Sequence, residues 1–118
     1  WMVDGPAQVL ATRAMLDRSW QVNAQQRIRD CAVLTRQLFS PLFDRVSPVQ
    51  QIHTPLFSSY QLSSEQADKL HNHFASLGIL LRVITLDQHF SLLRIGVINA
   101  TDETLCNRVR EAVANYVG

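Results

Sequence analysis

Apolar residues in the first third of the chain recur every three or four positions, as they do on one face of an α-helix. No glycine interrupts the chain between Ala7 and Leu42, and the first proline after this start is Pro41. The pattern predicts two helices, or one long bent helix, over residues 7–42. The first apolar stripe contains Val9, Leu10, Ala14, Leu16 and Trp20, and the second contains Ile28, Cys31, Leu34, Leu38 and Leu42.

After Pro41 the apolar period changes, and two short runs have the residue types of extended strands, at 46–52 and 56–62. They are separated by residues 53–55, where Pro55 disfavours a helical conformation at Thr54. In the second run, Phe57, Ser59 and Gln61 occupy alternate positions. We therefore expect these three side chains to share one face of a strand.

The second half of the chain predicts a helix, two strands and a last helix. Ser63 and Gln66 have the spacing of a capping box, so a helix is expected over 64–77, with Gly78 as its stop. Apolar runs at 79–85 and 90–98 are expected as strands joined by residues 86–89. Acidic residues after Thr101 favour a helix start there, and the apolar spacing continues to residue 116.

The predicted order is helix, helix, strand, strand, helix, strand, strand, helix. Such an order predicts an α+β fold in which a small, mostly antiparallel sheet of about four strands packs on helices. With 118 residues, of which 47% are hydrophobic, the chain is expected to form one domain over residues 1–118.

Charge and cysteine usage narrow the class of protein. The formal net charge is +1, from 11 basic and 10 acidic residues, so electrostatics gives no reason to expect nucleic acid or an anionic membrane as a partner. No apolar stretch approaches the roughly 20 residues of a membrane span. Cys31 and Cys106 have no C-x-x-C spacing, so we interpret both as small core residues. This usage favours a reducing cytoplasmic location.

Each of the last two predicted strands carries one arginine, Arg82 in I-L-L-R-V-I and Arg94 in S-L-L-R-I-G-V. A charge within an apolar strand is costly unless it is paired or has a function. A partly desolvated guanidinium suits a carboxylate or phosphate, which it binds through two parallel hydrogen bonds. Ligand binding is therefore one interpretation. The other is an internal salt bridge to one of four acidic residues: Glu65, Asp68, Asp87 or Glu103.

Other candidate chemistry is weak. His71 and His73 are two residues apart on a predicted helix, so they face different directions and cannot share a metal ion. His53 and His89 are expected in turns and exposed to solvent. Neither a nucleophile–histidine pattern nor a glycine-rich phosphate loop is present, so no catalytic or metal-binding residue is predicted. Three aromatic residues are interpreted as packing residues: Trp1, Trp20 and Tyr60.

Several stretches together resemble the fold-type I pyridoxal-phosphate enzymes. W-M-V-D-G-P-A at 1–7 is similar to the family's "W-x-V-x-G-P-A", and T-P-L-F at 54–57 is similar to "G-T-P-L-F", with His53 in place of glycine. G-I-L-L-R-V at 78–83 looks like "G-I-L-V-R", and L-L-R-I-G-V at 92–97 looks like the family's "L-R-F-G-L" or "L-R-I" stretch. The resemblance covers essentially the whole chain, and it is strongest to the subgroup that contains threonine-phosphate decarboxylase of cobalamin biosynthesis.

The resemblance implies a role for both arginines. Arg94 matches the arginine that binds the α-carboxylate of the substrate, and Arg82 matches a second arginine that faces the substrate's anionic end. It also implies that this chain is the C-terminal small domain, and that the cofactor pyridoxal 5'-phosphate belongs to a large domain absent from it. The only lysine, Lys69, lies in A-D-K-L-H, which does not match the cofactor-lysine motif. We therefore expect no covalently bound cofactor and no activity in this chain alone.

The function that the resemblance implies is substrate binding within a longer enzyme acting on an amino acid or phospho-amino acid. Decarboxylation of threonine phosphate is the first interpretation, and a histidinol-phosphate type of aminotransferase is the alternative. The full-length protein is expected to be a homodimer. Two other classes stay open: a stand-alone α+β module that binds a small anion, and an interaction domain in which both arginines are salt-bridged.

Overall fold

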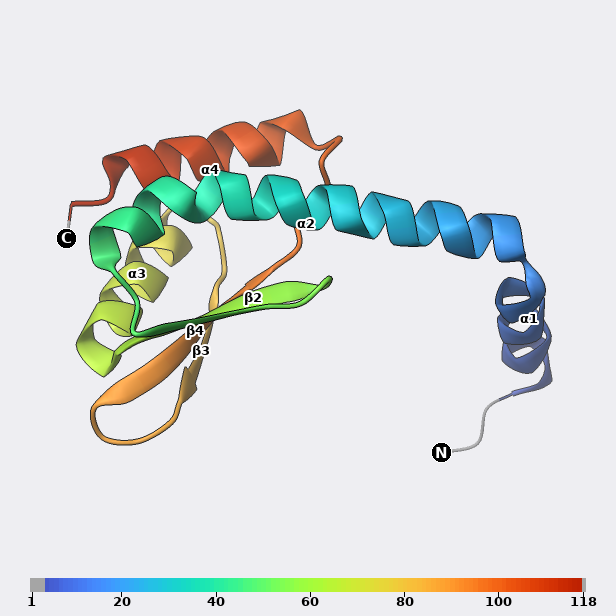
Figure 1. Ribbon diagram of the computed structural model, residues 1–118, viewed down its shortest axis with the longest axis horizontal. Helices are drawn as coiled ribbons and strands as arrows, with labels where there is room; N and C mark the ends of the chain where they lie inside the picture. Colours follow the sequence, from blue (N-terminus) through green and yellow to red (C-terminus); the bar gives the residue numbers. More distant parts are fainter. Residues whose placement is uncertain (1–3, 118) are drawn as a thin grey trace.

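The computed structural model describes residues 4–117 and contains two helices, a β-hairpin, a third helix, a second pair of strands and a fourth helix (Figure 1). The element order and the α+β class are therefore those predicted from the sequence. Trp1, which was interpreted as a packing residue, lies outside the described residues.

A single residue, Asp17, separates the first two helices, α1 (Gly5–Leu16) and α2 (Arg18–Val46). Its backbone N–H donates to the carbonyl of Arg13 at the end of α1. Its carboxylate accepts a 2.9 Å hydrogen bond from the N–H of Trp20 in the first turn of α2. Because Asp17 serves both helix ends, the chain turns sharply here, and α1 lies away from the body of the molecule (Figure 1).

The first apolar stripe does not contribute to the core. No residue of α1 is buried, and Leu16 and Trp20 are 75% and 57% exposed. The interpretation of Trp20 as a packing residue is therefore wrong. The helical period was correct, but the described residues include no element that covers this stripe.

The expected end of the second helix near Pro41 is also wrong, because α2 continues to Val46. Leu42 and Phe43 follow the proline and are almost completely buried, so the helical conformation places both in the core. The Arg45 guanidinium, one turn further, donates to the carbonyls of Val113 at 2.6 Å and Tyr116 at 3.2 Å. Burial and these bonds outweigh the one hydrogen bond that a proline removes.

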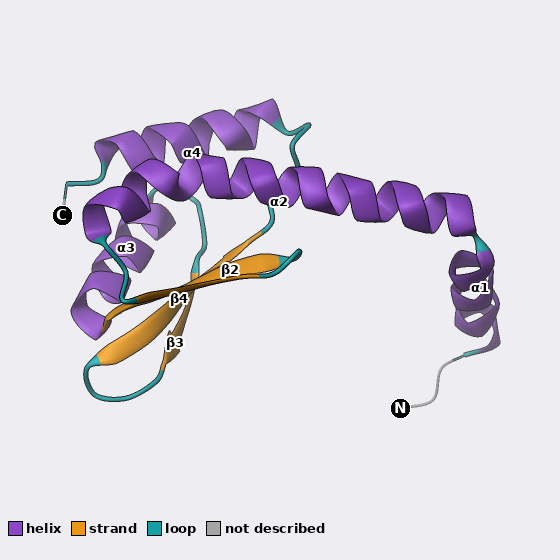
Figure 2. Cartoon of the chain, viewed as in Figure 1, coloured by secondary structure: helices purple, strands orange, loops and turns teal. Residues whose placement is uncertain are grey.

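The four strands form one antiparallel sheet in the order β1-β2-β4-β3 (Figure 2). They are β1 (Gln50–His53), β2 (Phe57–Ser63), β3 (Arg82–Thr85) and β4 (Phe90–Gly96). β3 and β4 are shorter than the expected runs at 79–85 and 90–98. Ile79, Leu81 and Ile98 lie outside these strands but are still buried. His53 lies at the end of a strand rather than in a turn.

The core lies between one face of the sheet and three helices: the second half of α2, α3 (Ser64–Ser76) and α4 (Glu103–Asn115). Phe43 stacks on Tyr60 of β2 with ring centroids 3.5 Å apart, and Phe39 contacts Phe74 of α3. Burial of Tyr60 raises the pKa of its hydroxyl above the usual 10.0. These contacts confirm the interpretation of Tyr60 as a packing residue. Cys106 is also buried, but Cys31 is only half-buried, at the edge of the core.

Within residues 4–117, no helix combines the length and apolar character that crossing a membrane requires.

Candidate functional site

The helices cover only one face of the sheet, and within residues 4–117 no helix packs on the other (Figure 2). Strand alternation places Tyr60 and Leu93 on the covered side, where both are buried. We call the opposite side the open face. It carries residues from all four strands: Ile52, Phe57, Ser59, Ile84, Arg82, Leu92 and Arg94.

Arg82 and Arg94 are directly opposite each other in the antiparallel pairing of β3 with β4. Their side chains therefore leave the sheet on the same face, within the separation of a cross-strand pair. The sequence predicted neither this register nor the direct pairing. Two like charges facing each other are destabilising by themselves, so the pair is not explained by the stability of the sheet.

Arg94 is half-buried and is held from two sides. Its Nε donates a hydrogen bond to the Ser59 Oγ at 3.3 Å, and its guanidinium carbon lies 4.1 Å from the centre of the Phe57 ring. Ser59 is only 3% exposed, because it lies beneath the arginine. Gly96 pairs with Phe57 across the strands and has open space where a Cβ would stand. The ring and the hydroxyl orient the guanidinium plane before any ligand binds.

Neither arginine forms an ion pair within the described residues, where the sole salt bridge joins Lys69 and Glu65. Asp87, another of the acidic candidates, accepts the backbone N–H groups of His89 and Phe90 at 2.7 and 2.8 Å. These bonds hold the pKa of the Asp87 carboxyl below its usual range. The salt-bridge interpretation of the two arginines is therefore wrong for residues 4–117.

Ser59 and Phe57 are the site residues that sequence reasoning did not identify. Their alternation on the strand was visible, but their position beside Arg94 depends on the register of β2 with β4. That register is set by packing on the covered side, where Tyr60 pairs with Leu93 and both are buried.

The arrangement is suited to an anion. The Arg94 side chain makes one hydrogen bond within residues 4–117, through Nε, so both terminal nitrogens remain able to donate. Arg82 is exposed and adds a second guanidinium beside them. A ligand with a carboxylate and a further anionic group matches this pair of donors.

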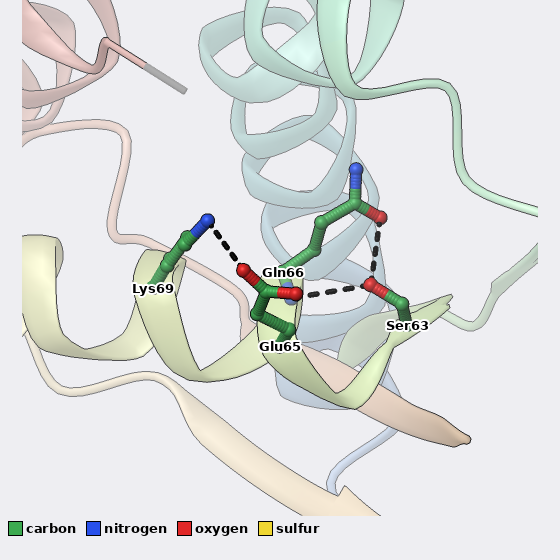
Figure 3. A network of polar contacts seen from close by, with 4 residues as sticks. All are labelled: Ser63, Glu65, Gln66 and Lys69. Carbon is green, nitrogen blue, oxygen red and sulfur yellow. Dashed lines mark hydrogen bonds and ion pairs between the residues drawn. The ribbon is translucent and has the colours of Figure 1, made fainter.

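Lys69 does not have the surroundings of a cofactor lysine. It is on α3, its side chain is 60% exposed, and its Nζ lies 2.7 Å from the Glu65 carboxylate (Figure 3). The neighbouring carboxylate raises the pKa of Lys69, which keeps the amine protonated and unreactive. Ser63 and Gln66 beside them form the N-terminal cap of α3, as predicted. Lys69 therefore does not offer the free amine that a Schiff base with pyridoxal phosphate requires.

The histidines do not gather into a metal site. His71 Nδ1 lies 2.8 Å from the Leu81 carbonyl just before β3, and His73 Nε2 lies 2.8 Å from the Ala112 carbonyl in α4, so the two rings contact different parts of the chain. Within the described part of the chain, no group of three histidine, cysteine or acidic side chains could hold a metal ion.

Comparison of the chain with protein-family models, with curated proteins and with solved structures found no match.

Proposed function

We propose that this chain is the C-terminal, substrate-binding portion of a pyridoxal-phosphate-dependent enzyme that acts on a phospho-amino acid, with threonine-phosphate decarboxylase as the activity. The observation that carries the proposal is the pair of arginines on the open face. They lie directly opposite each other and lack an ion-pair partner among residues 4–117. The residue motifs at 1–20, 54–57, 78–83 and 92–97 supply the choice of enzyme family.

In this proposal Arg94 binds the α-carboxylate of the substrate. Its two terminal nitrogens donate to the two carboxylate oxygens, while Ser59 and Phe57 keep the guanidinium in place. Arg82 binds the second anionic group, the substrate phosphate. Holding both ends of the substrate fixes the orientation of its Cα bonds, which decides the bond that breaks. Transamination by a histidinol-phosphate type of enzyme is the alternative outcome of the same binding mode.

The open face would meet a large domain that holds the cofactor, and this chain would contribute recognition rather than cofactor chemistry. Two surfaces support a larger assembly. The open face carries half-buried apolar side chains around the arginines, and α1 leaves Val9, Leu10 and Leu16 exposed. In the proposed full-length homodimer in the cytoplasm, these surfaces would pack on the large domain, which would remove apolar area from water.

Two steps test the proposal. The first is to sequence the coding DNA upstream of Trp1, where we expect the reading frame to continue and to encode the cofactor lysine. A frame that opens at Met2 would refute the enzyme and favour a stand-alone anion-binding module.

The second step is an assay of the full-length protein with O-phospho-L-threonine, following release of carbon dioxide. Arg94→Gln removes a charge-assisted pair of hydrogen bonds, so we expect kcat/KM to fall by about 10²-fold, with a higher KM and a lower kcat. The matched control is Arg110→Gln, on the exposed side of α4, where Arg110 contacts Asn107. Unchanged kinetics in the Arg94 variant would refute its assignment.

A further inference from the structure

A trough runs between the side of α2 and the turn that joins β1 to β2, and Phe57 at its end is the one lining residue that also belongs to the open face. Its first part has a volume of about 320 Å³ and lies between Arg29–Arg36 of α2 and His53–Pro55. Its second part has a volume of about 560 Å³ and continues toward Phe57. The two parts share Arg29, Thr54 and Pro55 in their walls, so they form one continuous depression.

The wall of the trough is cationic. Arg29 and Arg36 are seven residues apart on α2, so both lie on the same side of the helix, about 10.5 Å apart along its axis. Among the described residues that line the trough none is acidic, and neither arginine has an ion pair within residues 4–117. Arg29 donates to the Gln26 side chain, which carries no charge. An anionic occupant would therefore meet two uncompensated positive charges.

Between these charges the surface is apolar. Val33 lies between the two arginines on α2 and is 45% exposed, and Leu56 in the turn is 60% exposed. Ile28 and Pro55 complete the apolar floor. The trough thus presents a positive charge, an apolar contact and a second positive charge in sequence along α2.

The edge of the sheet lies next to the trough. β1 is the first strand in the order β1-β2-β4-β3, so it is paired on one side only, and all four of its residues are exposed. Alternate residues of such an edge strand turn their N–H and C=O groups outward. β1 lacks the lysine or proline that usually protects an edge strand, since Pro48 and Pro55 lie outside it.

We propose that the trough and the outer edge of β1 bind an extended acidic peptide segment, which adds a strand to the sheet. Successive residues of a strand point to opposite faces, so every second side chain enters the trough, at a spacing of about 7 Å. Acidic residues at positions i and i+4 would reach the long side chains of Arg29 and Arg36, and an apolar residue at i+2 would contact Val33 and Leu56. The order of Arg29, Val33 and Arg36 along α2 therefore favours a peptide with an acidic, an apolar and an acidic residue at alternate positions.

The probe is the heptapeptide acetyl-Thr-Glu-Thr-Leu-Thr-Glu-Thr-amide, titrated into the ¹⁵N-labelled chain and followed by NMR. We expect saturable shifts at Arg29, Arg36 and the β1 amides, together with slower hydrogen exchange of the outward-facing amides of β1. The double variant Arg29→Gln/Arg36→Gln should bind about tenfold more weakly, because two charge-assisted contacts are lost. Arg110→Gln removes a charge elsewhere and should bind as the unaltered chain does.

Four results would overturn the proposal. The first is equal binding of the peptide that has lysine in place of both glutamates. The second is a set of shifts confined to Arg82 and Arg94, which would place acidic peptides on the open face. The third is that sodium octanoate reproduces the shifts while the peptide leaves exchange of the β1 amides unchanged, which would assign a small-anion pocket. The fourth is a concentration-dependent shift of β1 without peptide, which would assign pairing between copies of this chain.

Discussion

Replacing Arg82 by glutamate should make the isolated chain more stable, although it removes half of the proposed substrate site. Arg82 faces Arg94 directly across β3 and β4, with no acidic partner among residues 4–117. Arg82→Glu replaces a repulsive cross-strand pair with an attractive one. If Arg82 serves ligand binding, its repulsion from Arg94 lowers the free energy of unfolding of the chain. The substitution measures that loss.

The magnitude follows from the geometry. Two unit charges about 6 Å apart in water interact by about 0.7 kcal/mol, and measured cross-strand pairs contribute roughly 0.2–1 kcal/mol. The substitution removes the repulsion and adds an attraction, while the exposure of Arg82 and salt screening reduce both. We expect the free energy of unfolding to rise by about 1 kcal/mol at low ionic strength, and by less at high salt.

Urea denaturation of four proteins measures the effect: the unaltered chain, Arg82→Glu, Arg94→Gln and the double variant. The gain from Arg82→Glu should disappear when Arg94 is already replaced, because the coupling is between these two side chains. Arg110→Glu makes the same change in net charge, from +1 to −1, and should give no such gain. If Arg82→Glu is no more stable than this control, or gains equally without Arg94, the arginines do not repel each other and the reasoning fails.

Three further predictions concern the fold. Phe74→Ala should lower the free energy of unfolding by about 3–5 kcal/mol in urea denaturation, because Phe74 is fully buried against Phe39. Arg45→Met should cost about 1–3 kcal/mol and speed hydrogen exchange in the last turn of α4, since the carbonyl of Val113 loses its bond to the guanidinium. Burial raises the pKa of Tyr60, so the folded chain holds this proton longer than the unfolded chain as pH increases, and stability should fall above about pH 10. Thermal unfolding measured against pH should show a smaller loss of stability above about pH 10 in Tyr60→Phe. An equal loss in this variant would mean that other groups cause it.

Local signals predicted most of the secondary structure because they depend on neighbouring residues. Ser63 caps the helix as expected, by accepting the backbone N–H of Gln66 at its hydroxyl, and the helix reaches Ser76. The expected end of α2 near Pro41 was wrong because distant contacts override a local signal. The proline is a local signal against a helix, but burial of Leu42 and Phe43 by distant segments overrides it.

The candidate site shows the same division between local and distant information. Period-two alternation predicts that Phe57 and Ser59 share one face of their strand, and the structure confirms it. The contacts of Arg94 with Ser59 and Phe57, and its direct pairing with Arg82, depend on registers between strands that are separated in sequence. A single sequence contains no direct signal for those registers, so only the structure identifies the four residues as one site.

The exposed stripe on α1 has a physical explanation of the same kind. A helical period predicts that one face of the helix is apolar, and the face of α1 from Val9 to Leu16 is apolar. It does not predict which element covers that face. Within residues 4–117 no element buries it.

The most direct test of the proposed function is an NMR titration of this chain with O-phospho-L-threonine that observes the arginine Nε–H groups. The account predicts saturable shifts of Arg94 and Arg82 together with the amides of Phe57 and Ser59, and their loss in Arg94→Gln but not in Arg110→Gln. Shifts that are absent, or that persist in Arg94→Gln, would show that the open face does not recognise the substrate.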